Sequence, residues 1–194
     1  MKRFAMLLTV MMLAITSAFS ASQPTEVKAK VSLNLTDADV TGYKVGFTTQ
    51  AKLDENKNWE KSVNDLTDFP AEVTDIQLGY DKSNGFVSDT SHFIFYKLRG
   101  SKGVTLKLSA DKALTKADGT KIDYTVVVNG QNDANVVDTE GSGKSWTSAT
   151  IDMDPTTGCK TGTLSLAIKS KAPVNATQVG EYSSTLTLTV SSVG

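Results

Sequence analysis

Residues 27–35 read Val-Lys-Ala-Lys-Val-Ser-Leu-Asn-Leu, with an apolar side chain at every second position. The five apolar residues, which we call the N-terminal stripe, are Val27, Ala29, Val31, Leu33 and Leu35. A period of two residues is typical of a β-strand that buries one face and exposes the other. The stretch therefore predicts a chain built from half-buried strands.

The same alternation recurs along the rest of the chain, separated by Gly-, Asn- and Ser-rich turns. The further strand candidates are Tyr43–Thr49, Val73–Tyr80, Phe93–Leu98, Val104–Ser109, Ile122–Val128, Ser148–Met153, Leu164–Ile168 and Thr185–Val190. Leu53–Leu66 is the one segment that could supply a short helical turn. About nine short strands with such turns favour an all-β fold, an antiparallel immunoglobulin-like β-sandwich.

The first residues carry an export signal. Met1-Lys2-Arg3 precedes the apolar run Phe4–Ile15 and the small-residue segment Thr16–Ala21, which is the pattern of a secretory signal peptide. Cleavage after Ser20 would leave residues 21–194 as a single domain. We expect a bacterial protein that is secreted, displayed on the cell surface, or held in the periplasm.

Charge and composition exclude several classes of function. Without Lys2 and Arg3 the chain has 18 basic and 21 acidic residues, and Arg99 is its single arginine. Nucleic-acid binding requires clustered Lys and Arg, so it is not expected. No apolar run after the signal approaches the length of a membrane span, so none is expected there.

The sequence offers little for catalysis or cofactor binding. Its one cysteine, Cys159, and its one histidine, His92, have no flanking signature of a nucleophile and its base. We therefore expect an inert thiol, no enzymatic activity and no cofactor, with an intermolecular disulfide through Cys159 as the exception.

Residues 54–65 have the spacing of a calcium loop. Oxygen-bearing side chains stand at its ligand positions: Asp54, Asn56, Asn58, Glu60 and Asp65. The sixth position, where such a loop needs glycine for its sharp turn, is Trp59. We expect a solvated polar loop and no metal.

Two tryptophans support an alternative function. Trp59 and Trp146 could form a flat platform on which sugar rings stack, which would make the protein a monomeric, secreted carbohydrate-binding sandwich. The competing interpretation places both rings in the packing of the sandwich.

The C-terminal segment adds a second strand of interest. Gly180-Glu181-Tyr182-Ser183-Ser184 is followed by alternating Thr and Leu up to Val190, with apolar positions at Tyr182, Leu186, Leu188 and Val190. This ending is similar to the last strand of bacterial fimbrial subunits and other Ig-like surface proteins. Gly103–Leu108 and Asp118–Tyr124 follow the hairpin rhythm of the same domains. The single cysteine and the ending Val193-Gly194 depart from the common pilin pattern.

The resemblance implies an incomplete sandwich, a periplasmic chaperone, and assembly into a homopolymer by strand exchange. On that basis the N-terminal stripe, within residues 21–36, would be the donor. Gly180 and the apolar positions up to Val190 would form the edge of the groove. The residues alone leave open whether the stripe pairs within its own sheet or with a neighbour, because strand addition needs the same alternation.

Overall fold

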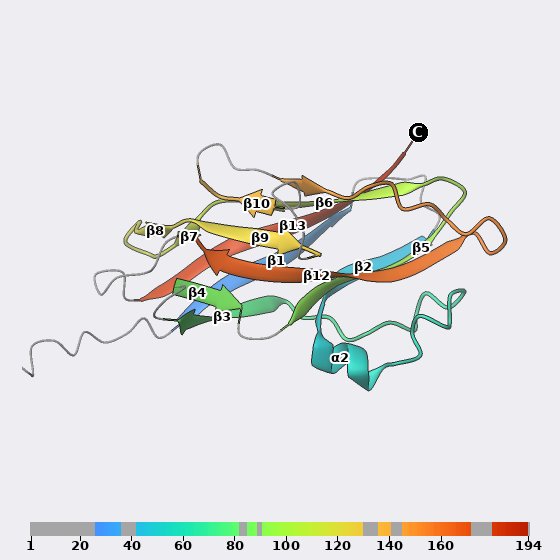
Figure 1. The fold of residues 1–194 in the computed structure, drawn as a ribbon, viewed down its shortest axis with the longest axis horizontal. Coiled ribbons are helices and arrows are strands. Elements are labelled where there is room, and N and C mark those ends of the chain that lie inside the picture. Colours follow the sequence, from blue (N-terminus) through green and yellow to red (C-terminus); the bar gives the residue numbers. More distant parts are fainter. Residues whose placement is uncertain are drawn as a thin grey trace, which may run out of the picture.

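The computed structural model describes residues 26–35, 42–81, 85–88, 91–129, 136–140, 145–171 and 180–193. For residues 26–35 and 80–81 it describes the backbone alone. The predicted signal peptide, residues 1–20, lies outside the described residues. In the described part the chain forms thirteen strands and one short helix (Figure 1).

One layer of the fold is built around the last strand. The C-terminal strand β13 (Glu181–Ser192) pairs with β1 (Glu26–Leu35) on one side and with β6 (Val104–Ala110) on the other. Beyond β6 lies β11 (Trp146–Thr147), and beyond β1 lies β3 (Asp75–Asp81). A small hairpin of β7 (Leu114–Thr115) and β8 (Lys121–Ile122) joins the start of β13.

The second layer is built around β12 (Cys159–Ser170). Its first half pairs with β5 (His92–Arg99), which pairs in turn with β2 (Gly42–Thr49). Its second half pairs with β9 (Tyr124–Val128), next to β10 (Val136–Asp138). The short strand β4 (Gly85–Ser88) pairs with both β3 and β12 and so links the two layers.

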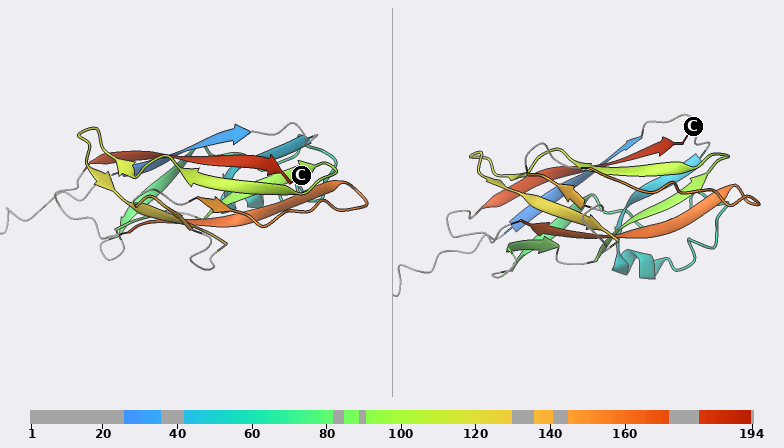
Figure 2. Two further views of the ribbon diagram at one scale, coloured as in Figure 1. Left: turned by 90° about the horizontal axis from the view of Figure 1, so that it is seen from above. Right: turned by 45° about the horizontal axis from the view of Figure 1, so that its top comes forward.

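The layers pack face to face along the long axis of the molecule (Figure 2). On β6, β9 and β13 alternate residues are buried, as the two-residue period predicts, whereas β2 and β5 carry runs of consecutive buried residues. On β13 the fully buried positions include Leu186 and Leu188, and on β12 and β9 they include Ile168, Tyr124, Val126 and Val128. The all-β sandwich expected from the sequence is confirmed.

Some elements differ from the prediction. Ser148–Met153 is not a strand. The side-chain hydroxyl of Ser148 accepts a hydrogen bond from the amide of Leu106, and within the segment only Ile151 forms a β-bridge, to Val104. The predicted strand Ile122–Val128 is broken at Asp123 into β8 and β9. The β1–β13 pair is parallel in an otherwise antiparallel sandwich.

Helix is a minor component, as expected. The helix α2 (Gln50–Glu55) follows β2 directly and begins at Thr49, whose hydroxyl accepts the amide of Lys52 at 3.4 Å. No helix in the described part of the chain has the length and hydropathy to cross a membrane.

Candidate functional site

The first strand fills a slot between two strands that have no direct pairing with each other among the described residues. β1 pairs in parallel with β13 over ten residues, from Glu26 opposite Glu181 to Leu35 opposite Val190. Its first half, Val27 to Lys30, also pairs antiparallel with β3. We call this space, bounded by β3 and β13, the β1 slot.

The register of the slot places the two predicted stripes side by side. Val27, Val31, Leu33 and Leu35 pair with Tyr182, Leu186, Leu188 and Val190, in that order. All four side chains on β13 are at most 2% exposed. Directly paired residues share one face of a sheet, so this is the register expected if both stripes face the core. The sequence identified both partners of the slot, and the structure places them within the same chain.

The remaining residue of the N-terminal stripe, Ala29, has a polar partner. Ala29 lies opposite Ser184, which is 2% exposed. The hydroxyl oxygens of Ser184 and of Tyr124 on β9 lie 2.8 Å apart. Ser184 also donates toward Asp111 Oδ1 and the carbonyl of Lys112, at 3.0 and 2.6 Å. One wall of the β1 slot is thus tied to the opposite layer by hydrogen bonds.

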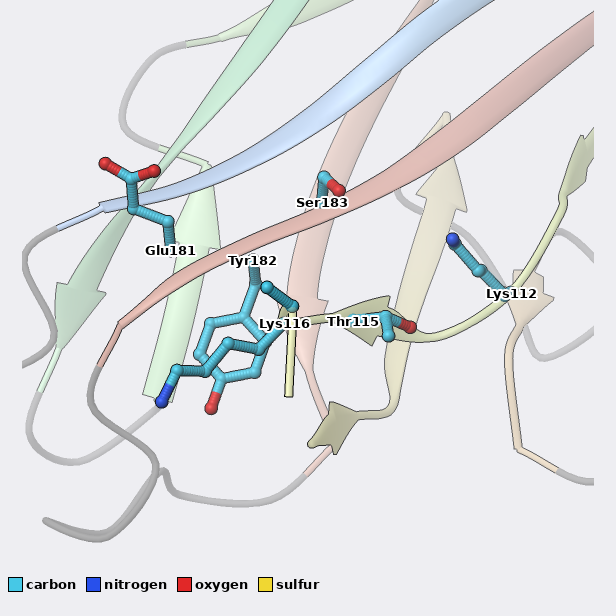
Figure 3. Close-up of a pocket in the computed structure, with 7 residues that line it drawn as sticks. Lys112, Thr115, Lys116, Glu181, Tyr182 and Ser183 are labelled. Atoms are coloured by element: carbon cyan, nitrogen blue, oxygen red, sulfur yellow. The ribbon is translucent and has the colours of Figure 1, made fainter. Parts of the chain in front are cut away.

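A cavity of about 630 Å³ lies beside the start of β13. It is lined by Lys112, Thr115, Lys116, Ala117, Glu181, Tyr182 and Ser183 (Figure 3). The Lys116 ammonium forms an ion pair with Asp118 at 3.0 Å. Burial raises the pKa of Tyr182. Gly180, with φ of +140°, is closely approached by the Lys116 side chain, so glycine suits that position.

A second polar centre lies on the outer face of β5. Lys97 is fully buried, and its ammonium donates to four oxygen atoms at 2.6 to 3.2 Å: the carbonyls of Ser62, Asp65 and Asp68, and the Ser62 hydroxyl. Burial lowers the pKa of Lys97, and the carboxylates of Asp68 and Asp65 oppose that shift. The loop around Lys97 is therefore organised by a cation from its own chain.

Residues 54–65 form a largely exposed polar loop, as expected, in which only Trp59 is buried. Asp65 accepts hydrogen bonds from the amide and hydroxyl of Thr67, at 2.8 and 2.6 Å, while Asp54 accepts one from Gln50 at 3.0 Å. The hydrogen bonds from the hydroxyl and the amide of Thr67 hold the pKa of Asp65 below its ordinary value. Within the described ranges no three His, Cys, Asp or Glu side chains gather where a metal ion could bind.

Both tryptophans are buried, which removes the exposed platform that the carbohydrate-binding alternative requires. Trp59 is 2% exposed and meets the ring of Phe95 edge-on, with 6.0 Å between centroids. Its ring also lies 5.9 Å from the Lys97 ammonium. Trp146 is 4% exposed and belongs to the main core. Neither indole offers a free face to a sugar.

Cys159 and His92 lie far apart on one ladder. Cys159 on β12 pairs with Arg99, whereas His92 on β5 pairs with Leu166. Seven residues of strand separate the two pairs, which corresponds to about 23 Å. The two side chains are therefore out of reach of each other as a nucleophile and its base.

Comparison with known proteins adds no further constraint: no protein-family model matches the chain, and no curated protein matches it significantly.

Three parts of these sites were not anticipated from the sequence. Ser184 is a polar residue among the apolar alternate positions of β13, so the apolar pattern did not identify it as buried. The cavity depends on the β7–β8 hairpin folding back on β13, which no local pattern indicates. Lys97 did carry a signal, because it interrupts the apolar run Phe93–Leu98.

Proposed function

We propose that the chain is an exported structural subunit that assembles with copies of itself by exchange of β1, in the manner of a fimbrial subunit. The observation that carries the proposal is the β1 slot. Strand β1 is the first described element, and among the described strands it pairs with β3 and β13. A copy of the same segment from another molecule could make the same hydrogen bonds.

Filling the β1 slot with a β-strand is energetically favourable, whichever molecule supplies the strand. With β1 absent, the main-chain groups of β13 facing the slot would lose ten residues of pairing, and the apolar side chains of β13 would gain access to water. Each of these large side chains contributes on the order of 1.5–3 kcal/mol when buried. An empty slot would therefore bind an extended apolar segment, by the strand-addition mode. A periplasmic chaperone that fills the slot before assembly fits the same requirement.

Exchange of an identical element is a low-cost route to assembly because the native contacts are reused. If each molecule donates to the next, the contact does not close and a filament results. If two molecules donate to each other, a dimer results. A structural or adhesive role at the cell surface follows from the filament.

The test compares the chain from Ala21 with a variant that lacks residues 21–36. We expect the longer chain to give a heat-sensitive ladder on SDS gels and a broad mass distribution by light scattering, and the shorter one to give neither. A peptide of residues 26–35 should bind the shorter variant, and the same peptide with Val31→Pro, which removes a ladder amide, should not. A monomer in both chains would contradict the proposal and assign β1 to its own sheet alone.

A further inference from the structure

The free edge of β2 is covered by a loop of the same chain. Strand β2 pairs with β5 along all eight of its residues and with no other described strand. The segment after α2 turns back over its open side, and we call residues 56–73 the cover loop. The amide of Val73 donates to the Phe47 carbonyl at 2.8 Å, and the Thr48 hydroxyl donates to the Ala71 carbonyl at 2.8 Å.

Charged and aromatic contacts hold this part of the cover loop against β2. Lys44 forms an ion pair with Glu72, and its ammonium lies 4.4 Å from the ring centroid of Phe69. The Phe69 ring stacks on Phe95 of β5, with 6.2 Å between centroids. Pro70 is buried and has no amide hydrogen, so the covering segment cannot extend the sheet as a regular strand.

The rest of the cover loop closes on Lys97. Three carbonyls, spread over residues 62 to 68, converge on its ammonium. Asn56, the first residue of the cover loop, ties the start of the loop to residues 68 and 69, because its amide nitrogen donates to Asp68 at 2.8 Å and to the Phe69 carbonyl at 3.3 Å. The cation is thus placed where it fixes the segment that leads directly into residues 69–73.

We infer that Lys97 is a latch, whose ammonium holds the cover loop over β2 and so prevents that edge from pairing with the β2 edge of a second copy of the chain. An uncovered eight-residue edge is a template for such pairing. The inference rests on the proposed function only in one respect: with β2 closed, assembly is directed to the β1 slot.

The test uses Lys97→Met, which removes the ammonium but keeps an unbranched apolar side chain. The matched control is Lys107→Met, on the exposed face of β6. The readout is hydrogen exchange at three amides with defined acceptors: Lys61 to Asn58, Asp65 to Ser62, and Val73 to Phe47. In Lys97→Met we expect all three to exchange about tenfold faster or more, while β6 and β13 stay protected. Lys107→Met should leave them unchanged.

Self-association provides the second readout. Lys97→Met should form dimers by light scattering as its concentration rises, and amides of residues 42–49 should become more protected in the dimer. These dimers should persist in a variant that also lacks residues 21–36, which separates this result from strand exchange through β1. If Val73 stays protected in Lys97→Met, or if the exposed edge leaves the variant monomeric, the latch is wrong.

A measurement on the unaltered chain covers the case in which Lys97→Met does not fold. Under native conditions with low denaturant, the amides of Lys61, Asp65 and Val73 should share one opening step, separate from and easier than the global unfolding that exposes β6. If Val73 opens only with the whole molecule, the cover loop is not a separate unit and the inference fails.

Discussion

The hydroxyl oxygens of Tyr124 on β9 and Ser184 on β13 lie 2.8 Å apart in the centre of the sandwich. Ser184 has a single proton, and its acceptors are Asp111 and the Lys112 carbonyl. The Tyr124 hydroxyl is therefore the donor between the two layers. Because Ser184 also lies opposite Ala29 of β1, this bond fixes one wall of the β1 slot against the layer built around β12.

Tyr124 should make the protein sensitive to alkaline pH. Burial raises the pKa of its hydroxyl to about 12 from 10.0, and the nearby carboxylate of Asp111 adds to the shift. Between pH 10 and 12 the unfolded chain loses this proton and the folded chain keeps it, so the free energy of unfolding falls as pH rises.

The matched variant is Tyr124→Phe, which should lose about 1 kcal/mol of stability at neutral pH. It should also show a shallower decline between pH 10 and 12 than the parent. Denaturant unfolding at a series of pH values measures both effects, and absorbance at alkaline pH should show one fewer late-titrating tyrosine. Equal alkaline slopes in the two proteins would contradict the burial of this hydroxyl.

The apolar wall of the β1 slot should be a main source of stability. Leu188 on β13 is fully buried in the core. Leu188→Ala leaves a cavity and should cost about 2–5 kcal/mol in the free energy of unfolding. Val193, which directly follows β13 and is 40% exposed, is the control. Val193→Ala should change stability by less than about 0.5 kcal/mol. Similar losses in both variants would be inconsistent with this core.

The turn beside the cavity should loosen in acid. The pKa of Asp118 is lowered to about 2 from 3.8, mainly by hydrogen bonds from Thr120, with the Lys116 side chain adding to them. The stabilisation is complete above the ordinary pKa and is lost as pH falls from about 4 to about 2. Gly119, with φ of +87°, completes this turn.

Exchange or chemical shift of the Thr120 amide, which donates to Asp118 at 2.9 Å, reports the loosening. Asp118→Asn keeps an acceptor oxygen but does not titrate, so its Thr120 amide should be insensitive over this range. A parent signal that is equally insensitive would mean that the carboxylate does not hold the turn.

Much of the fold could be predicted because two-residue periodicity is a local property. Val27 to Leu35 and the positions from Tyr182 to Val190 identified both partners of the β1 slot. Their parallel pairing could not be predicted, since alternation is the same in either direction. The polar loop at residues 54–65 was predicted from its own residues, whereas Lys97, whose ammonium binds the carbonyl of Asp65, lies about thirty residues away in the chain. Tertiary partners of this kind leave no periodic signal.

The thiol of Cys159 should be inert in the folded protein. It is 2% exposed, and its Sγ lies 3.6 Å from Asn64 Oδ1 and 3.4 Å from the Thr157 carbonyl, so the cover loop shields it from one side. We expect slow reaction with a thiol reagent under native conditions and rapid reaction in denaturant. Asn64→Ala, at an exposed position of the loop, should accelerate the native reaction, and Cys159→Ser should assemble as the parent does. A disulfide-linked dimer on non-reducing gels of the native protein, absent from Cys159→Ser, would show instead that the loop opens widely enough for two chains to meet at this sulfur.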